Sequence, residues 1–489
     1  FGSEAKAILT HPDVPRKRND HATHLLANLR YVQSEQTLFK DIHHVPPGSY
    51  LVHENGKSKV SRYYEFNPEV QDISFEDAKD GIQARLKEAV RRQLISDVPI
   101  GVYLSGGIDS SSLVAMMSEL GVDDIRTFTL GFNEPTDEFD SAKMIADQFS
   151  TNHQTLSLDL DPMKHFPNVI WHSEVPKINL LQGHMMSQFV SKHVKVVLGG
   201  LGGDELFAGY DIHGIFHSLR SLSGTIPKTV EKMIGTPLGK LMSSLQRKSG
   251  IMKWDEYRRG LQTVLASGNV LRQLLILRNV WDHEESVLKQ IYSKNFIDKA
   301  LPIVESEFIE ISNSFAEKSA IDQVLGIEFQ TKMVNDYLWT EDRMSMSHSV
   351  EERVPFLDRD LVEFAFSIPA NLKIKSGRKK SILRSAMSPY LPKEIIEKKK
   401  WGFTVNPYLQ FQKDLKQTVE KVLTRELVEK QGIFNYDYIL SILEYKPSPK
   451  LRWHYNFLWI LAGLAIWEKM FIQTDAFMQK DHSLETYYS

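Results

Sequence analysis

The chain has 489 residues, of which 42% are hydrophobic and 25% charged, and its formal net charge is −3 at pH 7. This is the composition of a globular protein long enough for about two to four domain-sized units. Without an excess of Lys and Arg it does not favour a nucleic-acid surface, and without cysteine it excludes disulfides, thiolate metal sites and a cysteine nucleophile within these residues.

The first residues look like the middle of a domain. The letters FGSEAKAIL run from an apolar strand end into a helical pattern with no capping sequence before it, which favours a further segment upstream of Phe1. From Val45, alternating apolar positions surround the turn signal Glu54-Asn55-Gly56, which is typical of a β-hairpin. We therefore predict that residues 1–68 are β-rich edge material from the end of one domain.

From residue 69 to about 480, strand-like and helical patterns alternate. Residues 75–95 carry apolar side chains at helical spacing, and VPIGVYLS follows as a short strand-like run. The next segments are strand-like 127–132, helical 140–150, helical 181–193 and strand-like 194–200. This order predicts an α/β unit with a parallel sheet and helices on both faces, and the patterns after residue 211 are mostly helical.

The most apolar stretch is FLWILAGLAIW, from Phe457 to Trp467. It has about half of the roughly 20 residues that a membrane-spanning helix needs, and charged residues flank it. We predict a buried helix and no membrane anchor. The N-terminal residues also lack the pattern of a secretion signal, so a cytoplasmic enzyme is the default expectation.

The sharpest motif is SGGIDSS, residues 105–111, between a strand-like run and a helical pattern. Two glycines after a buried strand let the backbone turn tightly and point consecutive N–H groups, with the positive end of the next helix, at an anion. The serines add hydroxyl donors, and Asp109 is suited to a magnesium ion that neutralises phosphate charge. A plain glycine turn with a capping serine is the alternative interpretation. The lysine of the GxxxxGK[ST] nucleotide loop is absent.

A second glycine string, GGLGGDELFAGY at residues 199–210, also follows a predicted strand. Ligands bind at the carboxyl ends of the strands in open parallel sheets, so we expect the two glycine loops to face one nucleotide. Asp204 would then lie opposite Asp109 across a magnesium ion. The alternative, a glycine-rich turn with exposed acids, becomes less favoured once the first loop is taken into account.

These motifs resemble those of the asparagine synthetase B family, which includes β-lactam synthetases and lasso-peptide cyclases as relatives. SEAKAIL and PPGSYL resemble the end of its glutaminase domain, while VPIGVYLSGGIDSS, GGDELFAGY, MSMSHSVEERVPFLD and KKSILR resemble successive synthetase motifs. The resemblance covers nearly the whole chain. It implies a remnant of an Ntn-hydrolase domain over residues 1–68 and an N-type ATP pyrophosphatase domain, adenine nucleotide α-hydrolase-like, over residues 69–480 with a helical C-terminal part.

By motif, the resemblance implies ATP and Mg²⁺ as cofactors, with Asp109 and Asp204 as the metal ligands. The residues implied in holding pyrophosphate are Ser105, Gly106, Gly107, Asp109 and Ser110, and those bordering the nucleoside are Leu104, Leu130 and Gly200. The segment KKKWGF, residues 398–403, resembles the element with the family's catalytic lysine, which we place at Lys400. A fixed cation beside the α-phosphate would offset the charge that develops as pyrophosphate leaves. Lys379 and Lys380 are weaker candidates for the same phosphate field.

Two features depart from the family pattern. Its glutaminase uses an N-terminal cysteine, which this sequence lacks, so nitrogen would come through a glutaminase segment missing upstream, from a separate chain or as free ammonia. Leu201 stands where asparagine synthetases commonly carry an acidic residue and β-lactam synthetases a tyrosine. A leucine side chain can neither accept a proton nor hydrogen-bond an amine.

We therefore expect an ATP-dependent amide-forming ligase that activates a small-molecule carboxylate, with aspartate favoured, as an acyl-adenylate for attack by ammonia from glutamine. One alternative is an amidotransferase or cyclase acting on another carboxylate, which Leu201 and the unusual stretch Glu174–Gln182 favour. An alternative of another class is a non-catalytic scaffold, against which the intact Asp109, Asp204 and Lys400 argue. The resemblance is compatible with a homodimer, and nothing points to a nucleic-acid or membrane partner.

Overall fold

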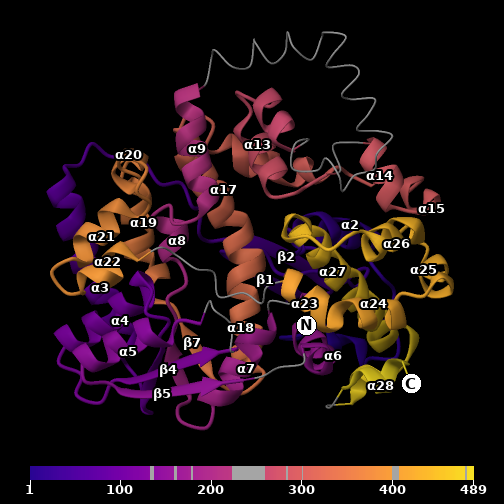
Figure 1. Cartoon of the computed structure of the whole chain (residues 1–489), viewed down its shortest axis with the longest axis horizontal. Helices are drawn as coiled ribbons and strands as arrows, with labels where there is room; N and C mark the ends of the chain where they lie inside the picture. The colour runs from indigo at the N-terminus through magenta and orange to yellow at the C-terminus, as the bar shows by residue number, and fades with distance from the viewer. Residues whose placement is uncertain are drawn as a thin grey trace.

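The computed structural model describes residues 1–132, 137–158, 162–177, 180–222, 259–281, 285–299, 301–398, 407–479 and 482–488. Within them, five parallel strands form one sheet in the order β5-β4-β3-β6-β7 (Figure 1). The strands are β3 (Ile100–Tyr103), β4 (Arg126–Gly131), β5 (Asn152–Ser157), β6 (Val196–Leu198) and β7 (Glu351–Arg353). The parallel sheet predicted from the alternating patterns is confirmed, although β5 and β7 had given no strand signal.

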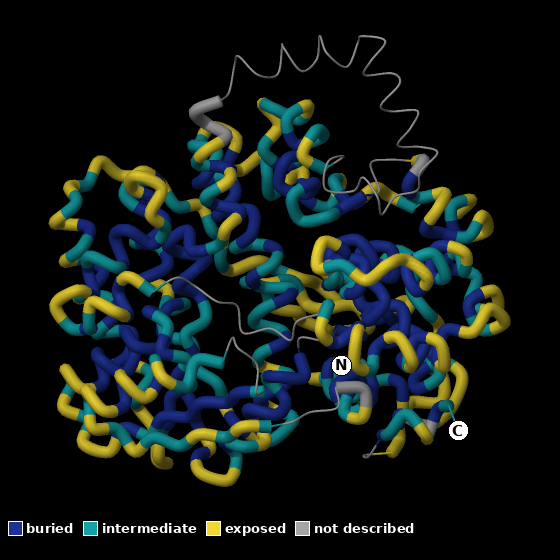
Figure 2. Tube along the Cα trace, in the orientation of Figure 1, coloured by how far each residue is buried: buried dark blue, intermediate teal, exposed yellow. Residues whose placement is uncertain are grey.

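Helices cover both faces of this sheet, as predicted. On one face lie α3 (Phe75–Gln93), α4 (Ile108–Glu119) and α5 (Phe139–Gln148), and on the other lie α6 (Pro162–Ser173), α7 (Leu180–Val190) and α18 (Trp339–Met346). Successive side chains of a strand point to opposite faces, so each face buries its own set. Val102 and Leu198 belong to one apolar core, while Phe128 and Val197 belong to the other. Figure 2 shows buried residues in dark blue through the interior of the molecule.

The helix α3 forms where the sequence predicts it, because its local signals and its packing agree. The Ser74 side chain caps it by accepting a hydrogen bond from the Asp77 N–H at 3.1 Å. The apolar residues at helical spacing, Ala78, Ile82, Leu86 and Val90, are all fully buried. This face of α3 packs on α4, the helix that follows the SGGIDSS loop, and so helps to fix the position of that loop.

The first 68 residues contain two helices, α1 (Ala5–Leu9) and α2 (Asp20–Leu29), and the predicted hairpin of β1 (Ser49–Glu54) and β2 (Lys57–Arg62). The turn residues of this hairpin, Asn55 and Gly56, have the positive φ angles, 51° and 72°, that a two-residue hairpin turn requires. The hairpin strands are largely exposed, whereas the Phe39 ring lies 4.9 Å from that of Trp467. This segment therefore shares a core with the C-terminal helices, and a domain boundary after residue 68 stays a prediction.

The rest of the described chain is mainly helical, as predicted. A long run from α17 (Ala320–Glu328) through a π-helical turn (Phe329–Leu338) into α18 crosses the middle of the molecule (Figure 1). The other helices are α8 (Gly203–Leu206), α9 (Asp211–Leu222), α13 (Val270–Leu277), α14 (Glu285–Ile291), α15 (Lys294–Ile297), α16 (Ile309–Asn313), α19 (Arg359–Ser367), α20 (Ala370–Lys373), α21 (Ser381–Met387), α22 (Lys393–Glu397), α23 (Pro407–Gln410), α24 (Lys416–Val422), α25 (Arg425–Gln431), α26 (Tyr436–Glu444), α27 (Arg452–Glu468) and α28 (Leu484–Tyr488).

The apolar stretch predicted as a buried helix lies in α27. Among the described residues, one helix, Trp453–Gln473, has the length and composition that crossing a membrane requires, and 83% of its apolar window is buried inside the protein. Trp459 and Trp467 are at most 1% exposed, and the Trp467 indole N–H donates to the Glu174 carbonyl at 2.9 Å. The helix is therefore packed as part of the core.

Candidate active site

The SGGIDSS loop connects the end of β3 to the first turn of α4. The Ser105 N–H donates to the Ser110 hydroxyl, and the Gly107 N–H donates to the Ser105 hydroxyl, both at 3.2 Å. Gly106 has a φ of +65°, and a side chain there would collide with the backbone of Ser141. The loop is thus closed on itself in a conformation that needs glycine, with the N-terminus of a 12-residue helix behind it.

The structure brings together the two acids predicted at the ends of different strands. Asp109 lies in the first turn of α4, after β3, and Asp204 lies in the first turn of α8, after β6. The Lys380 ammonium stands between them, with Nζ 2.5 Å from Asp109 Oδ2 and 2.7 Å from Asp204 Oδ1. The Lys380 side chain is only 4% exposed. Sequence reasoning named this lysine as a weaker candidate, and its place between both acids is decided by the fold.

The glycines of the second loop explain how these groups come so close. A Cβ atom on Gly203 would collide with the Asp109 carboxylate, and one on Gly209 would collide with the Asp204 carboxylate and the Lys380 chain. A Cβ on Gly200 would lie only 3.1 Å from the Ser110 N–H nitrogen. The spacing of the glycines is therefore a packing requirement of this site.

The chemistry of this cluster fits a divalent cation. Carboxylate oxygens are the protein ligands that Mg²⁺ prefers, and two of them converge here on a single ammonium group. Burial lowers the pKa of Lys380, while the Asp109 charge raises it. The cluster already balances one buried cation, Lys380, against two acids. Asp109 and Asp204 therefore remain our predicted metal ligands. They lie beside the SGGIDSS loop, which we predict to hold phosphate.

We expect Asp109→Asn and Asp204→Asn each to weaken magnesium-dependent ATP binding by about tenfold or more, since loss of one coordinating charge lowers metal affinity. Calorimetry with ATP, with and without Mg²⁺, measures the effect. Glu119→Gln is a suitable control, because Glu119 lies at the far end of α4 with 46% of its side chain exposed. If both Asn variants bind Mg²⁺-dependent ATP like the parent, these acids do not hold the metal.

The three residues predicted to border the nucleoside lie at the carboxyl edge of neighbouring strands. Leu104 follows β3, Leu130 is near the end of β4 and Gly200 follows β6. The two leucine side chains are 1% and 3% exposed, so they belong to the core beneath this edge of the sheet. Their contact with a nucleoside stays a prediction.

The first lysine of the run after α22 makes two contacts near the first loop. The Lys398 Nζ lies 2.7 Å from Glu138 Oε1 and 3.5 Å from the Gly106 carbonyl oxygen. The Arg384 guanidinium also donates to the Lys398 carbonyl at 3.2 Å. The start of the run is therefore held against the SGGIDSS loop. Lys400 itself lies outside the described residues, and its catalytic role stays a prediction.

Two histidines close in sequence to the second loop make hydrogen bonds within the protein. His213 is 1% exposed and its Nε2 lies 3.2 Å from Glu328 Oε2, and His184 Nδ1 lies 3.1 Å from the Ser347 hydroxyl. Among the residues that the structure describes, no group of three or more His, Asp or Glu side chains is arranged to hold a metal ion. A magnesium ion held by the two predicted ligands would need further ligands, such as phosphate oxygens, to complete its shell.

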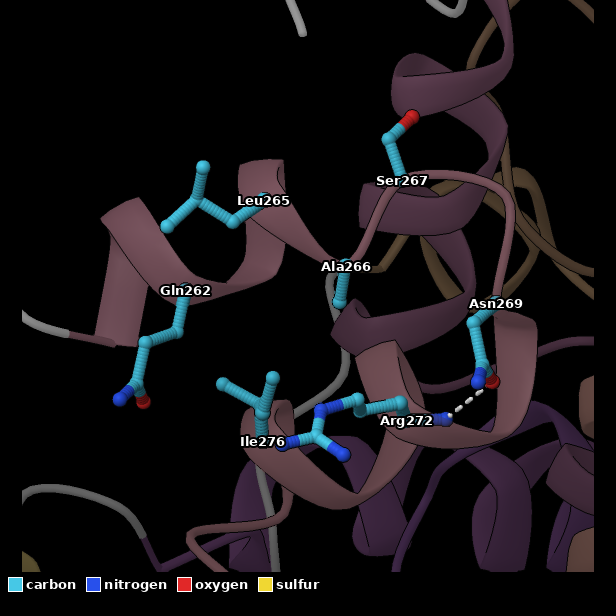
Figure 3. A pocket seen from close by; sticks show the side chains of 7 residues that line it. All are labelled: Gln262, Leu265, Ala266, Ser267, Asn269, Arg272 and Ile276. Atoms are coloured by element: carbon cyan, nitrogen blue, oxygen red, sulfur yellow. Dashed lines mark hydrogen bonds between the residues drawn. The ribbon is translucent and has the colours of Figure 1, made fainter. Parts of the chain in front are cut away.

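A separate pocket of about 380 Å³ lies near the start of α13 (Figure 3). In it the Asn269 side chain caps the helix by accepting from the Arg272 N–H at 2.9 Å, and the Arg272 guanidinium pairs with Glu305 at 3.2 Å. Its lining residues are Gln262, Leu265, Ala266, Ser267, Asn269, Arg272 and Ile276. These polar groups serve the local helix ends, and the pocket contains neither glycine loop.

Comparison with known proteins gives a consistent result. A family model described as asparagine synthase matches residues 81–469, and one described as glutamine amidotransferase domain matches residues 1–64. Asparagine synthetase [glutamine-hydrolyzing] 1 of Bacillus subtilis is 26% identical over 97% of this chain and 72% of its own length. A putative asparagine synthetase of Mycobacterium tuberculosis is 28% identical over 77% of this chain and 56% of its own length. Amidase chyE of Penicillium rubens is 27% identical over 82% of this chain and 64% of its own length. The chain therefore spans between 56% and 72% of the length of these three relatives.

Proposed function

The chain belongs to the asparagine synthase family, and we propose that it is the synthetase part of an ATP-dependent amide-forming ligase. The observation that carries this proposal is the convergence of Asp109 and Asp204, from two different strand ends, beside the SGGIDSS loop. Two acids and an array of backbone donors at one sheet edge are suited to a nucleotide triphosphate with its metal. A scaffold without catalytic activity has no physical need for this buried charge cluster.

In the proposed reaction, the acceptor carboxylate attacks the α-phosphorus of ATP and pyrophosphate leaves, and a nitrogen nucleophile then displaces AMP. The loop and the N-terminus of α4 would hold the pyrophosphate through backbone N–H groups. Asp109 and Asp204 would hold Mg²⁺, which supplies charge neutralisation when bound. Lys380 would keep the two acids in place before the metal arrives, since its ammonium contacts both.

Aspartate is the acceptor that we propose first, in line with the relatives whose names include asparagine synthetase. Leu201 favours a second candidate, the same chemistry on a different carboxylate, because its side chain cannot orient an amine by hydrogen bonding. Other relatives carry the name amidase, which agrees with a wider range of reactions in this group. Release of pyrophosphate that depends on the added carboxylate distinguishes the two candidates.

A protein of these 489 residues should form amide from ammonium salts and should release no glutamate from glutamine, because it contains no cysteine to act as the family's glutaminase nucleophile. Ammonia is the nucleophile, so the rate should rise with pH as the ammonium fraction falls. The measurement is pyrophosphate release with ATP, Mg²⁺, aspartate and ammonium chloride, compared across a panel of carboxylates.

The control omits the acceptor, which separates amide formation from plain ATP hydrolysis. Pyrophosphate release at the same rate without any carboxylate would contradict the proposed ligase activity. Glutamate production from glutamine by this protein would contradict the assignment of nitrogen supply to free ammonia.

A further inference from the structure

Lys398 lies where three segments that are far apart in the sequence meet. Its ammonium pairs with the Glu138 carboxylate at 2.7 Å, and its Nζ lies 3.5 Å from the Gly106 carbonyl oxygen. The Lys398 and Glu138 side chains are 19% and 14% exposed, so solvent screens their charges less than those of a surface pair. The ammonium is therefore a held charge beside the SGGIDSS loop.

The backbone of Lys398 is held as well as its side chain. The Arg384 guanidinium donates to the Lys398 carbonyl at 3.2 Å and also to the Ile396 carbonyl. Its Nε donates to the Lys379 carbonyl at 3.1 Å, and the next residue along the chain is the lysine that contacts both predicted metal ligands. One planar guanidinium therefore fixes Lys398 relative to the two-acid cluster.

Helix α5 contacts the same loop residue from another direction. A Cβ atom on Gly106 would collide with the backbone of Ser141 and Ala142 in the first turn of α5. Glu138 directly precedes this helix, and its carbonyl accepts from the Ala142 N–H at 3.0 Å. Gly106 therefore contacts α5 through its backbone carbon and Lys398 through its carbonyl, and Glu138 connects these two contacts.

The direction of the Gly106 carbonyl decides which backbone groups of the loop face an anion. In a planar trans peptide, the carbonyl of one residue and the N–H of the next point in opposite directions. Here the carbonyl approaches Lys398, and the Gly107 N–H donates to the Ser105 hydroxyl at 3.2 Å. Both residues of this peptide are glycines, so its plane can turn over with little steric resistance. A carbonyl oxygen turned towards phosphate oxygens would repel them.

We propose that Lys398, supported by Glu138 and Arg384, is a positioning residue for the phosphate loop. Its ammonium keeps the Gly106 carbonyl directed away from the bound nucleotide, so that the loop presents N–H groups to the β- and γ-phosphates. This role differs from the one predicted for Lys400, which acts on the chemical step at the α-phosphate. The inference rests on the proposed function, because it requires the loop to hold pyrophosphate.

The test measures the binding of pyrophosphate and ATP, each with Mg²⁺, and of AMP to Lys398→Met by calorimetry. Pyrophosphate and ATP should bind about tenfold or more weakly than to the parent, which is the scale of one hydrogen bond to a charged group. AMP lacks the β- and γ-phosphates, so its affinity should stay close to that of the parent. Turnover at saturating ATP should fall less than ATP affinity does, the reverse of the pattern expected for Lys400→Ala.

Three further variants separate the loop contact from a loss of charge balance. Lys398→Arg keeps a cation with N–H donors and should retain most of the pyrophosphate affinity. Lys398→Met combined with Glu138→Gln removes the carboxylate that would otherwise repel phosphate, and it should still bind pyrophosphate weakly. Lys143→Met is the matched control on α5, since Lys143 pairs with Asp147 through side chains that are 70% and 64% exposed, and it should match the parent.

Parental pyrophosphate affinity in Lys398→Met, or in its combination with Glu138→Gln, overturns the inference. An equal loss of AMP affinity also overturns it, because a change confined to the phosphate loop cannot weaken a ligand without the β- and γ-phosphates to the same extent. A parent that binds neither ATP nor pyrophosphate contradicts the proposed function instead.

Discussion

Replacing Lys380 with methionine should destabilise the metal-free protein by about 3–5 kcal/mol, which is the usual cost of removing one partner from a buried ion pair. The Asp109 and Asp204 side chains, 19% and 10% exposed, would be left as two carboxylates that repel each other with no cation between them. Methionine keeps most of the chain volume, so the loss reports on charge more than on packing. Thermal or urea unfolding without divalent cations measures the loss.

Addition of Mg²⁺ should recover much of this stability, because a cation that binds the folded state alone stabilises it in proportion to its affinity. Lys379→Met is the matched control, since Lys379 pairs with Asp211, whose side chain is 96% exposed, and surface pairs contribute little. Combining Lys380→Met with Asp109→Asn and Asp204→Asn should restore stability in the absence of metal. If Lys380→Met unfolds no more readily than Lys379→Met, the ammonium does not stabilise the two acids.

Lys400→Ala should reduce acceptor-dependent pyrophosphate release by roughly 10² to 10³, or about 3–4 kcal/mol, while ATP affinity stays within a few fold of the parent. A cation directed at the α-phosphate gains most when charge moves there, so its loss affects turnover more than ground-state binding. The measurement is turnover under saturating ATP, together with ATP affinity by calorimetry.

The choice of control follows from the contacts of the neighbouring lysine. Lys398 pairs with Glu138 and approaches the Gly106 carbonyl, so its replacement should loosen the phosphate loop and is no neutral comparison. Lys393→Ala, at an exposed position at the start of α22, should behave like the parent. Near-parent turnover in Lys400→Ala, or inactivity in Lys399→Ala instead, would show that the register assigned to this motif is mistaken.

The contacts of the second glycine loop explain why it contains so many glycines. Three glycines of the second loop each meet a charged side chain from elsewhere in the chain. Gly203 meets Asp109, Gly209 meets Lys380 and Gly199 meets Glu352. Substitution at any of these positions would therefore disturb charged groups as well as the backbone.

Local patterns were sufficient to predict a parallel sheet and the positions of the two glycine loops. The hairpin, the helix over residues 75–95 and the strands before both glycine strings follow from periodicity and turn chemistry, which act between residues close in the chain. The edge strands β5 and β7 could not be predicted in this way. Glu351–Arg353 is three charged residues long, and it forms a strand because β6 offers it unpaired backbone groups.

By itself, the sequence determined the α/β class, the position of both loops and the expectation that Asp109 and Asp204 meet, because strand ends in a parallel sheet share one edge. Only the tertiary structure decided that Lys380 stands between these acids and that Lys398 contacts the first loop. These contacts join residues more than ten positions apart, in one case 271, and the charge of each group is set by neighbours that no local pattern specifies.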